Sequence, residues 1–215
     1  MTERRQRLQA ARLYLVCDEQ RDEFLAAVLR AGVDVVQLRM KDAADAEIVA
    51  AARRFAHAAA QHGALFILND RPDLVAETGA DGVHVGQDDM SVADARRVVG
   101  ADLLVGLSTH TPEQVDAANA LDLDYIGVGP VHVTPTKPGR AAVGLELVSY
   151  AAEHATVPFF AIGGIAPDNL DAVRSAGAER IAVVRALTEA AEPARMARRL
   201  RQMISPASEA RVGWA

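Results

Sequence analysis

The sequence contains very little cysteine and no long uninterrupted run of apolar residues. Cys17 is the only cysteine among 215 residues, which excludes an internal disulfide and is typical of a reducing compartment. We expect it to be a small buried side chain on the first strand. No segment approaches the ~18 consecutive apolar residues of a membrane-spanning helix, and no apolar run follows the basic N-terminus as in a signal peptide. These absences predict a cytoplasmic protein without a membrane partner.

Lysine is also scarce, since only Lys41 and Lys137 are lysines among 23 basic residues. Because a compact, mobile ammonium is not interchangeable with a guanidinium, these two positions are candidates for function, with chance placement as the alternative. The formal net charge of -6 argues against a nucleic-acid partner. Half of the residues are hydrophobic, and the length suits one domain with a sizeable core.

A strand–helix unit recurs along the chain. Apolar runs typical of strands buried on both faces are expected at 12–16, 33–39, 65–69, 82–85, 103–107, 125–128, 157–162 and 180–184. Amphipathic segments follow them, the last over 193–204. We predict one α/β domain, a single (β/α)8 TIM barrel over about 12–204, with an extension at 1–11 and a tail at 205–215. A doubly wound open sheet is the alternative, but no GxGxxG follows the first strand.

The stretch 157–170 joins a buried strand to a helix through Gly163 and Gly164. Glycines let main-chain N–H groups approach an anion, and a helix N-terminus just beyond them adds a favourable dipole. The alternative is a tight turn that needs only a positive φ. A further strand at 180–184 favours the phosphate interpretation, because paired phosphate loops after the last two strands recur in such barrels.

Barrel active sites lie at the C-terminal ends of the strands. The polar residues expected there are Gln37, Arg39, Lys41, Asn69, Asp70, Gln87, Asp88, Asp89, Ser108, Thr109, His110, Thr134, Thr136 and Lys137. On a buried strand, His84 is expected to be a satisfied core histidine, whereas His110 at a strand end is the better candidate for function.

Asp70 and either Asp88 or Asp89 come from adjacent strands, so we expect them to lie near each other. Two carboxylates at ~4 Å repel by about 4 kcal/mol at an effective dielectric of ~20, and a bridging cation removes that cost. Hard oxygen ligands without cysteine or paired histidine suit Mg²⁺. The alternative is that these carboxylates only cap the following helices.

Three cations, Arg39, Lys41 and Lys137, would together with Mg²⁺ match a diphosphate. The run 134–137 offers hydroxyls and an ammonium on a proline-stiffened loop, although loop stiffening alone is the alternative. With Gly163-Gly164 as a second anion site, the pattern suggests two phosphorylated substrates or one bisphosphate.

Six motifs in this order resemble the thiamine-phosphate synthase (thiamine-phosphate pyrophosphorylase) family over roughly residues 12–204. They are Gln37-Leu38-Arg39-Met40-Lys41, Asn69-Asp70, Val83 to Asp89, Gly106-Leu107-Ser108, Thr134-Pro135-Thr136-Lys137 and Ile162-Gly163-Gly164-Ile165. The resemblance implies a transferase that condenses 4-amino-2-methyl-5-(diphosphooxymethyl)pyrimidine with 4-methyl-5-(2-phosphooxyethyl)thiazole to thiamine phosphate and diphosphate. It leaves open whether the chain forms a homo-oligomer.

The resemblance also implies residue roles. Substrate-binding residues would be Gln37, Leu38, Arg39, Met40, Lys41, Asn69, Ser108, Thr134, Pro135, Thr136, Lys137, Gly164, Val184 and Arg185. Among these, the catalytic residues would be Arg39, Lys41, Ser108 and Lys137. Mg²⁺ would be bound by Asp70 and Asp89. Diphosphate would depart first, and the thiazole nitrogen would attack the resulting pyrimidine cation without a protein nucleophile.

Two rival interpretations share the barrel. A thiazole tautomerase needs neither diphosphate nor Mg²⁺, so Asp70, Asp89 and Lys137 argue against it, while His110 keeps it open. A non-catalytic barrel that only binds thiazole phosphate is the other. A Schiff-base aldolase would require a lysine on an inner strand face, where neither lysine is expected.

Overall fold

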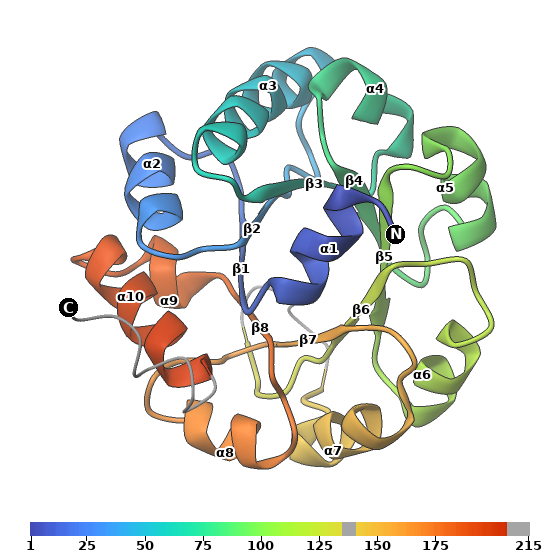
Figure 1. Cartoon of the computed structure of the whole chain (residues 1–215), viewed down its shortest axis with the longest axis vertical. Coiled ribbons are helices and arrows are strands. Elements are labelled where there is room, and N and C mark those ends of the chain that lie inside the picture. Colours follow the sequence, from blue (N-terminus) through green and yellow to red (C-terminus); the bar gives the residue numbers. More distant parts are fainter. Residues whose placement is uncertain (135–140, 206–215) are drawn as a thin grey trace.

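Eight parallel strands close into a barrel in sequence order (Figure 1). The computed structural model describes residues 1–134 and 141–205. The strands are β1 (Leu13–Cys17), β2 (Val35–Leu38), β3 (Leu65–Asn69), β4 (Gly82–Val85), β5 (Leu104–Thr109), β6 (Tyr125–Val128), β7 (Phe159–Ile162) and β8 (Ile181–Val183). Since β8 pairs with β1, Leu13 lying opposite Ile181, the single (β/α)8 TIM barrel is confirmed.

Helices surround the ring of strands, and α1 lies over the centre of the barrel in Figure 1. They are α1 (Glu3–Ala10), α2 (Asp22–Arg30), α3 (Asp45–Gln61), η1 (Pro72–Leu74), α4 (Val75–Thr78), α5 (Val92–Val99), α6 (Pro112–Ala118), α7 (Gly144–His154), α8 (Leu170–Ser175), α9 (Arg185–Thr188) and α10 (Pro193–Ile204). Within residues 1–134 and 141–205, no helix has the length and apolar character to cross a membrane.

Two apolar layers hold the barrel together. The larger lies between the strands and the surrounding helices, and it includes Cys17, which is 2% exposed as expected. The smaller fills the barrel interior and contains Tyr14, Tyr125 and Phe160. A Cβ on Gly106 would lie 2.2 Å from the Tyr125 ring, so this glycine on β5 makes room for the aromatic side chain.

The N-terminal extension is a helix, which the sequence analysis did not predict. Thr2 caps α1 by accepting from the Arg5 main-chain N–H. Only Leu8 of this helix is buried, and it joins the cluster inside the barrel. α1 therefore closes the N-terminal end of the barrel. The expected tail, apart from Ser205, lies outside the described residues.

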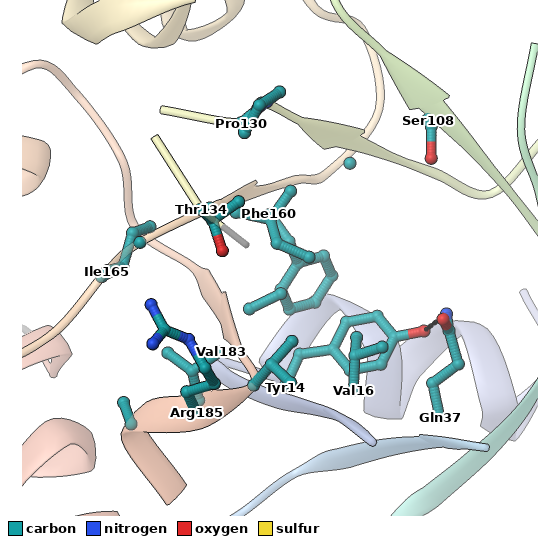
Figure 2. Close-up of a pocket in the computed structure, with 18 of the residues that line it drawn as sticks. Tyr14, Val16, Gln37, Ser108, Pro130, Thr134, Phe160, Ile165, Val183 and Arg185 are labelled. Carbon is teal, nitrogen blue, oxygen red and sulfur yellow. Dashed lines mark hydrogen bonds between the residues drawn. The ribbon is translucent and has the colours of Figure 1, made fainter. Parts of the chain in front are cut away.

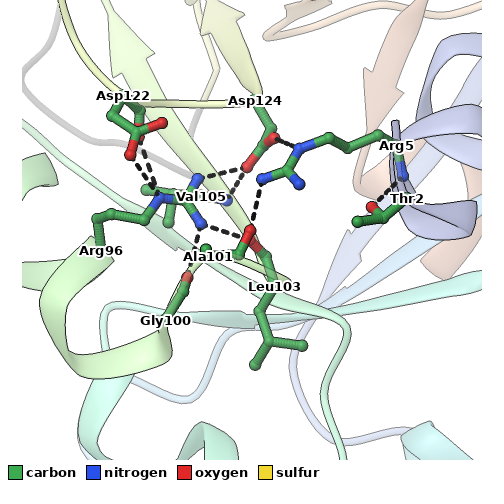
Figure 3. Close-up of polar contacts among 9 residues, drawn as sticks. All are labelled: Thr2, Arg5, Arg96, Gly100, Ala101, Leu103, Val105, Asp122 and Asp124. Carbon is green, nitrogen blue, oxygen red and sulfur yellow. Dashed lines mark hydrogen bonds and ion pairs between the residues drawn. The ribbon is translucent and has the colours of Figure 1, made fainter.

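At the N-terminal end of the barrel, aspartates bind arginine side chains and main-chain N–H groups, as Figure 3 shows for Asp124. Asp124 is a carboxylate that accepts from Arg5 Nε at 2.6 Å, Arg96 Nη2 at 2.7 Å and the Val105 main-chain N–H at 2.8 Å. On β3, Phe66 similarly donates its main-chain N–H to Asp81, which Arg4 also binds. Each of these carboxylates accepts from more than one donor, so ion pairs and hydrogen bonds stabilise this end of the barrel.

Candidate functional site

A cavity of about 320 Å³ opens at the C-terminal ends of the strands. Figure 2 shows it with Gln37, Ser108, Thr134 and Arg185 around Tyr14 and Phe160. Among the residues predicted from the sequence, those that line it are Gln37, Arg39, Asn69, Ser108, His110, Thr134, Gly163, Gly164, Val184 and Arg185. The structure thus brings together residues from six different strand ends.

A row of polar side chains forms the floor of the cavity. Gln37 Nε2 donates to the Tyr14 hydroxyl at 2.6 Å, and the two tyrosine hydroxyls, of Tyr14 and Tyr125, lie 3.0 Å apart. His84 lies between Tyr125 and Ser108, at 3.2 Å from the phenol and 2.9 Å from the serine hydroxyl. Both ring nitrogens of His84 are hydrogen-bonded, as expected of a satisfied histidine, but the residue is part-buried and lines the cavity, so the expectation of a core position is wrong.

A lysine and two carboxylates, together called the rim here, follow the ends of β2, β3 and β4, and two of them lie close in the chain to Arg39 and Asn69 of the cavity lining. Lys41 Nζ lies 3.1 Å from Asp70 Oδ2. Burial and a hydrogen bond with the Asp89 carboxyl raise the pKa of Asp70 above its usual range, while Lys41 opposes the rise. Of the two candidates, Asp89 is therefore the one beside Asp70, and three of the predicted charged residues meet at one place.

The backbone holds Asp70 in an uncommon conformation. Directly after β3 its φ is 60°, a left-handed value that aspartate tolerates better than most residues, and its main-chain N–H donates to the His84 carbonyl at 2.8 Å. Asp89 instead accepts from the Gly86 N–H at 2.8 Å. The following helix, α5, is capped by Ser91, so the suggestion that Asp70 and Asp89 only cap helices is wrong.

The carboxylate pair fits a divalent cation. Among the residues that the structure describes, no group of three or more histidine, cysteine or acidic side chains could hold a metal. Two carboxylates are nevertheless enough for Mg²⁺ when water and phosphate oxygens supply the remaining ligands. The contact between the Asp70 and Asp89 carboxyls favours this, because a cation between them would remove their mutual repulsion.

On the opposite side of the cavity lies the glycine turn after β7. Gly163 and Gly164 have φ values of 109° and 63°, so the turn does require glycine. A Cβ on Gly163 would lie 2.5 Å from Pro130, which shows how closely the β6–α7 loop packs on it. Asn169 braces the turn by donating to the Gly164 carbonyl at 2.8 Å and accepting from the Ala166 N–H at 2.9 Å.

The helix that presents its first turn to the cavity is α9, not α8 as the sequence suggested. α8 begins only at Leu170, outside the cavity lining, whereas Val184, Arg185 and Ala186 all line it. Arg185 Nη1 lies 3.7 Å from Glu189 on the same helix. A glycine loop after β7 and a short helix after β8 form the arrangement that barrels use for phosphate groups.

The remaining predicted residues contribute differently or lie outside the described chain. Leu38 is buried in the outer apolar layer, so its main-chain atoms are what remain for ligand contact, whereas Met40 packs against that layer and stays partly exposed. His110 lines the cavity and its Nδ1 is hydrogen-bonded to the Gly129 carbonyl. The predicted loop residues Pro135, Thr136 and Lys137 lie outside the described residues.

Sequence reasoning missed the aromatic part of the site. Tyr14, Tyr125 and Phe160 line the cavity, but each lies within an apolar run, a pattern that predicts a core residue. The period of two along a strand could have found them. Tyr14 lies two residues before Val16, which also lines the cavity, so the same phase faces inward.

The fold and the site together define a (β/α)8-barrel protein with two anion-binding candidates at the C-terminal end of the barrel. A family model described as thiamine monophosphate synthase matches residues 13–187. The chain belongs to the thiamine monophosphate synthase family.

Individual relatives agree with this assignment. A thiamine-phosphate synthase from Acidothermus cellulolyticus is 51% identical over 194 residues, covering 87% of this chain and 92% of the relative. Another, from Gloeobacter violaceus, is 51% identical over 193 residues, but the chain spans only 57% of its length. A solved thiamine phosphate pyrophosphorylase from Pyrococcus furiosus is 30% identical, with a TM-score of 0.83 over 93% of this chain and 96% of that one.

Proposed function

We propose that this protein is a cytoplasmic transferase that joins 4-amino-2-methyl-5-(diphosphooxymethyl)pyrimidine to 4-methyl-5-(2-phosphooxyethyl)thiazole, giving thiamine phosphate and diphosphate. The observation that carries the proposal is the presence of two separate anion-binding candidates on one cavity. One is the rim of Lys41, Asp70 and Asp89, and the other is the glycine turn with Arg185. Two phosphorylated substrates require two such places.

The diphosphate of the pyrimidine substrate belongs at the rim. Arg39 and Asn69 line the cavity, and Lys41 lies at the rim beside Asp70. When bound, Mg²⁺ would be held by Asp70 and Asp89 and would supply positive charge to the leaving diphosphate. Lys137, which follows β6 in the sequence, is proposed as a further cation for the same group.

The thiazole phosphate belongs at the opposite side. Gly164, Val184 and Arg185 line that part of the cavity together with Thr134. Arg185 and its ion-pair partner Glu189, 3.7 Å away, both line the cavity, which makes the guanidinium a candidate partner for the phosphate. This separation of the two anions leaves the reacting carbon and nitrogen between them.

The chain's own work is positioning and electrostatic stabilisation. The cation formed on loss of diphosphate is carried by the aminopyrimidine, and the thiazole nitrogen captures it, so no nucleophilic side chain is needed. Aromatic and aliphatic side chains such as Val16, Phe160 and Ile165 line the cavity and limit access of water.

Turnover with both substrates and Mg²⁺ tests the proposal directly. We expect thiamine phosphate and diphosphate to form in equal amounts, and neither to form when one substrate is omitted. Binding of thiazole phosphate without turnover would instead indicate the non-catalytic barrel. Isomerisation of a thiazole tautomer without the pyrimidine would indicate the tautomerase. His110, which lines the cavity, is the residue that keeps this rival open.

A further inference from the structure

Four hydrogen bonds link one side of the cavity floor to the other. They run from Gln37 to Tyr14 at 2.6 Å, from Tyr14 to Tyr125 at 3.0 Å, from Tyr125 to His84 at 3.2 Å and from His84 to Ser108 at 2.9 Å. The five side chains come from five different strands. Gln37 is 3% exposed and Ser108 8% exposed, so water competes little for these groups.

The position of each proton follows from the first donor. Among the described residues, the Tyr14 hydroxyl is hydrogen-bonded to the Gln37 amide, which donates to it, and to Tyr125, so Tyr125 is the acceptor left for the Tyr14 proton. Tyr125 then donates to Nδ1 of His84. With Nδ1 accepting, the neutral imidazole carries its proton on Nε2 and donates it to Ser108 Oγ.

Ser108 therefore receives a hydrogen bond on its oxygen and keeps its own proton for another acceptor. We propose that Tyr125 and His84 are positioning residues that turn the Ser108 hydroxyl into a hydrogen-bond donor toward the anionic leaving group. The identity of that group rests on the function proposed above, whereas the direction of the chain of hydrogen bonds does not. With the opposite direction, Ser108 would present a lone pair to the anion and repel it.

The packing keeps this arrangement in place. The ring of Phe160 meets those of Tyr14 and Tyr125 edge-on, with centroids 5.2 and 5.7 Å away. Gly106 leaves the space that the Tyr125 phenol fills, because a Cβ there would lie 2.6 Å from the hydroxyl oxygen. Burial raises the pKa of both phenols above its ordinary value, so the two protons stay on oxygen at working pH.

A kinetic test measures whether the effect of Tyr125→Phe on kcat depends on the presence of Ser108. Tyr125→Phe keeps the ring and removes the hydroxyl, and we expect it to lower kcat about tenfold, as for a weakened hydrogen bond to a charged group. Ser108→Ala should lower kcat by about 100-fold. In the Ser108→Ala background, Tyr125→Phe should change kcat less than about twofold, because its effect acts through the missing hydroxyl. An equal loss in both backgrounds would overturn the proposal.

A matched control removes a hydroxyl elsewhere. Tyr150 donates to Asp116 at 2.8 Å outside the floor, so Tyr150→Phe should leave kcat unchanged. Tyr14→Phe combined with Tyr125→Phe should cost no more than Tyr125→Phe alone, because either change breaks the same chain. The directed series of hydrogen bonds from Gln37 to Ser108 is called the relay below. Additive losses from the two changes would contradict the relay and indicate two separate packing effects.

The tautomer of His84 gives a readout that needs no turnover. Imidazole nitrogen chemical shifts, assigned with His84→Asn, should show a proton on Nε2 and none on Nδ1 in the unaltered protein. Tyr125→Phe should produce a mixture of tautomers. A proton on Nδ1 in the unaltered protein would overturn the relay. The expected tautomer in a protein without synthase activity would instead leave the relay standing and refute the proposed function.

Discussion

Aspartates meet basic side chains at both ends of the barrel, but with opposite results. At the N-terminal end Asp124 lies between Arg5 and Arg96 and accepts a main-chain N–H as well. At the C-terminal end Asp70 has one lysine and a second carboxylate, Asp89, which helps raise its pKa. One end has its charges matched within the chain, whereas the other keeps like charges together.

The difference indicates what each end contributes. Matched, partly buried charges hold α1 and the strand ends in place, which is a contribution to stability. A carboxylate pair with a positive φ at Asp70 costs free energy in the unliganded protein, and such costs cluster at functional sites. We therefore expect substitutions at the two ends to affect different measurements.

Asp124→Ala, at the N-terminal end of the barrel, should have the largest effect on the free energy of unfolding. Removing this carboxylate, which is 6% exposed, takes away the charged partner of Arg5 and the more buried of the two carboxylates that pair with Arg96, and we expect a loss of about 3 kcal/mol in the free energy of unfolding. Denaturant unfolding measures this, and kcat of the folded fraction should stay unchanged. Asp122→Ala is the matched control, because Asp122 also pairs with Arg96 but is 79% exposed, and it should cost less than about 1 kcal/mol.

Lys137→Ala should affect the C-terminal end alone. If Lys137 contacts the leaving group as proposed, its loss should lower kcat by roughly 10²–10³-fold with little change in the free energy of unfolding. The measurement is kcat with both substrates saturating, and Arg97→Ala, an exposed cation on α5, is the control. A near-normal kcat would remove Lys137 from the mechanism.

Asp89→Asn should weaken the dependence on Mg²⁺ while the protein stays folded. If Asp89 is a ligand, the Mg²⁺ concentration for half-maximal rate should rise at least about tenfold. Asp88→Asn, which changes the neighbouring exposed carboxylate, should leave the titration curve in place. Identical curves for the two variants would exclude Asp89 as a ligand.

Asp70→Asn should have a small effect on stability, in the opposite direction from Asp124→Ala. Because folding raises the pKa of the Asp70 carboxyl, the contribution of this group to the free energy of unfolding falls as the pH rises through that pKa. At neutral pH the charged Asp70 therefore lowers the stability of the unaltered protein. Asparagine tolerates the positive φ and removes the charge. We expect the free energy of unfolding at pH 7 to rise by up to about 1 kcal/mol, partly offset by the lost Lys41 pair, and the gain to vanish below about pH 4. A large destabilisation at pH 7 would break the comparison.

Much of the barrel could be predicted because its strands are apolar runs between glycine-rich helix ends. The ranges 65–69, 82–85 and 125–128 coincide with β3, β4 and β6. β5 extends to Thr109, two residues beyond the prediction, because polar side chains at Ser108 and Thr109 end the apolar run before the ladder ends. α1 was missed because one buried residue, Leu8, gives no apolar periodicity.

From the sequence, the site could be predicted only as the set of polar residues that follow the strands. Local pattern could not decide between Asp88 and Asp89, because the choice depends on how the loop after β4 folds back so that Gly86 donates to Asp89. Nor could it find the relay, because Tyr125 and His84 meet only when β4 and β6 close around Gly106 and Gly127. Long-range contacts of this kind leave little trace in the local sequence.

The most direct test of the central claim is a crystal structure with Mg²⁺ and diphosphate bound. The account predicts a metal ion coordinated by Asp70 and Asp89, with the diphosphate between that ion, Lys41 and Ser108. Diphosphate bound elsewhere, with the carboxyls of Asp70 and Asp89 still hydrogen-bonded to each other and no metal between them, would contradict it.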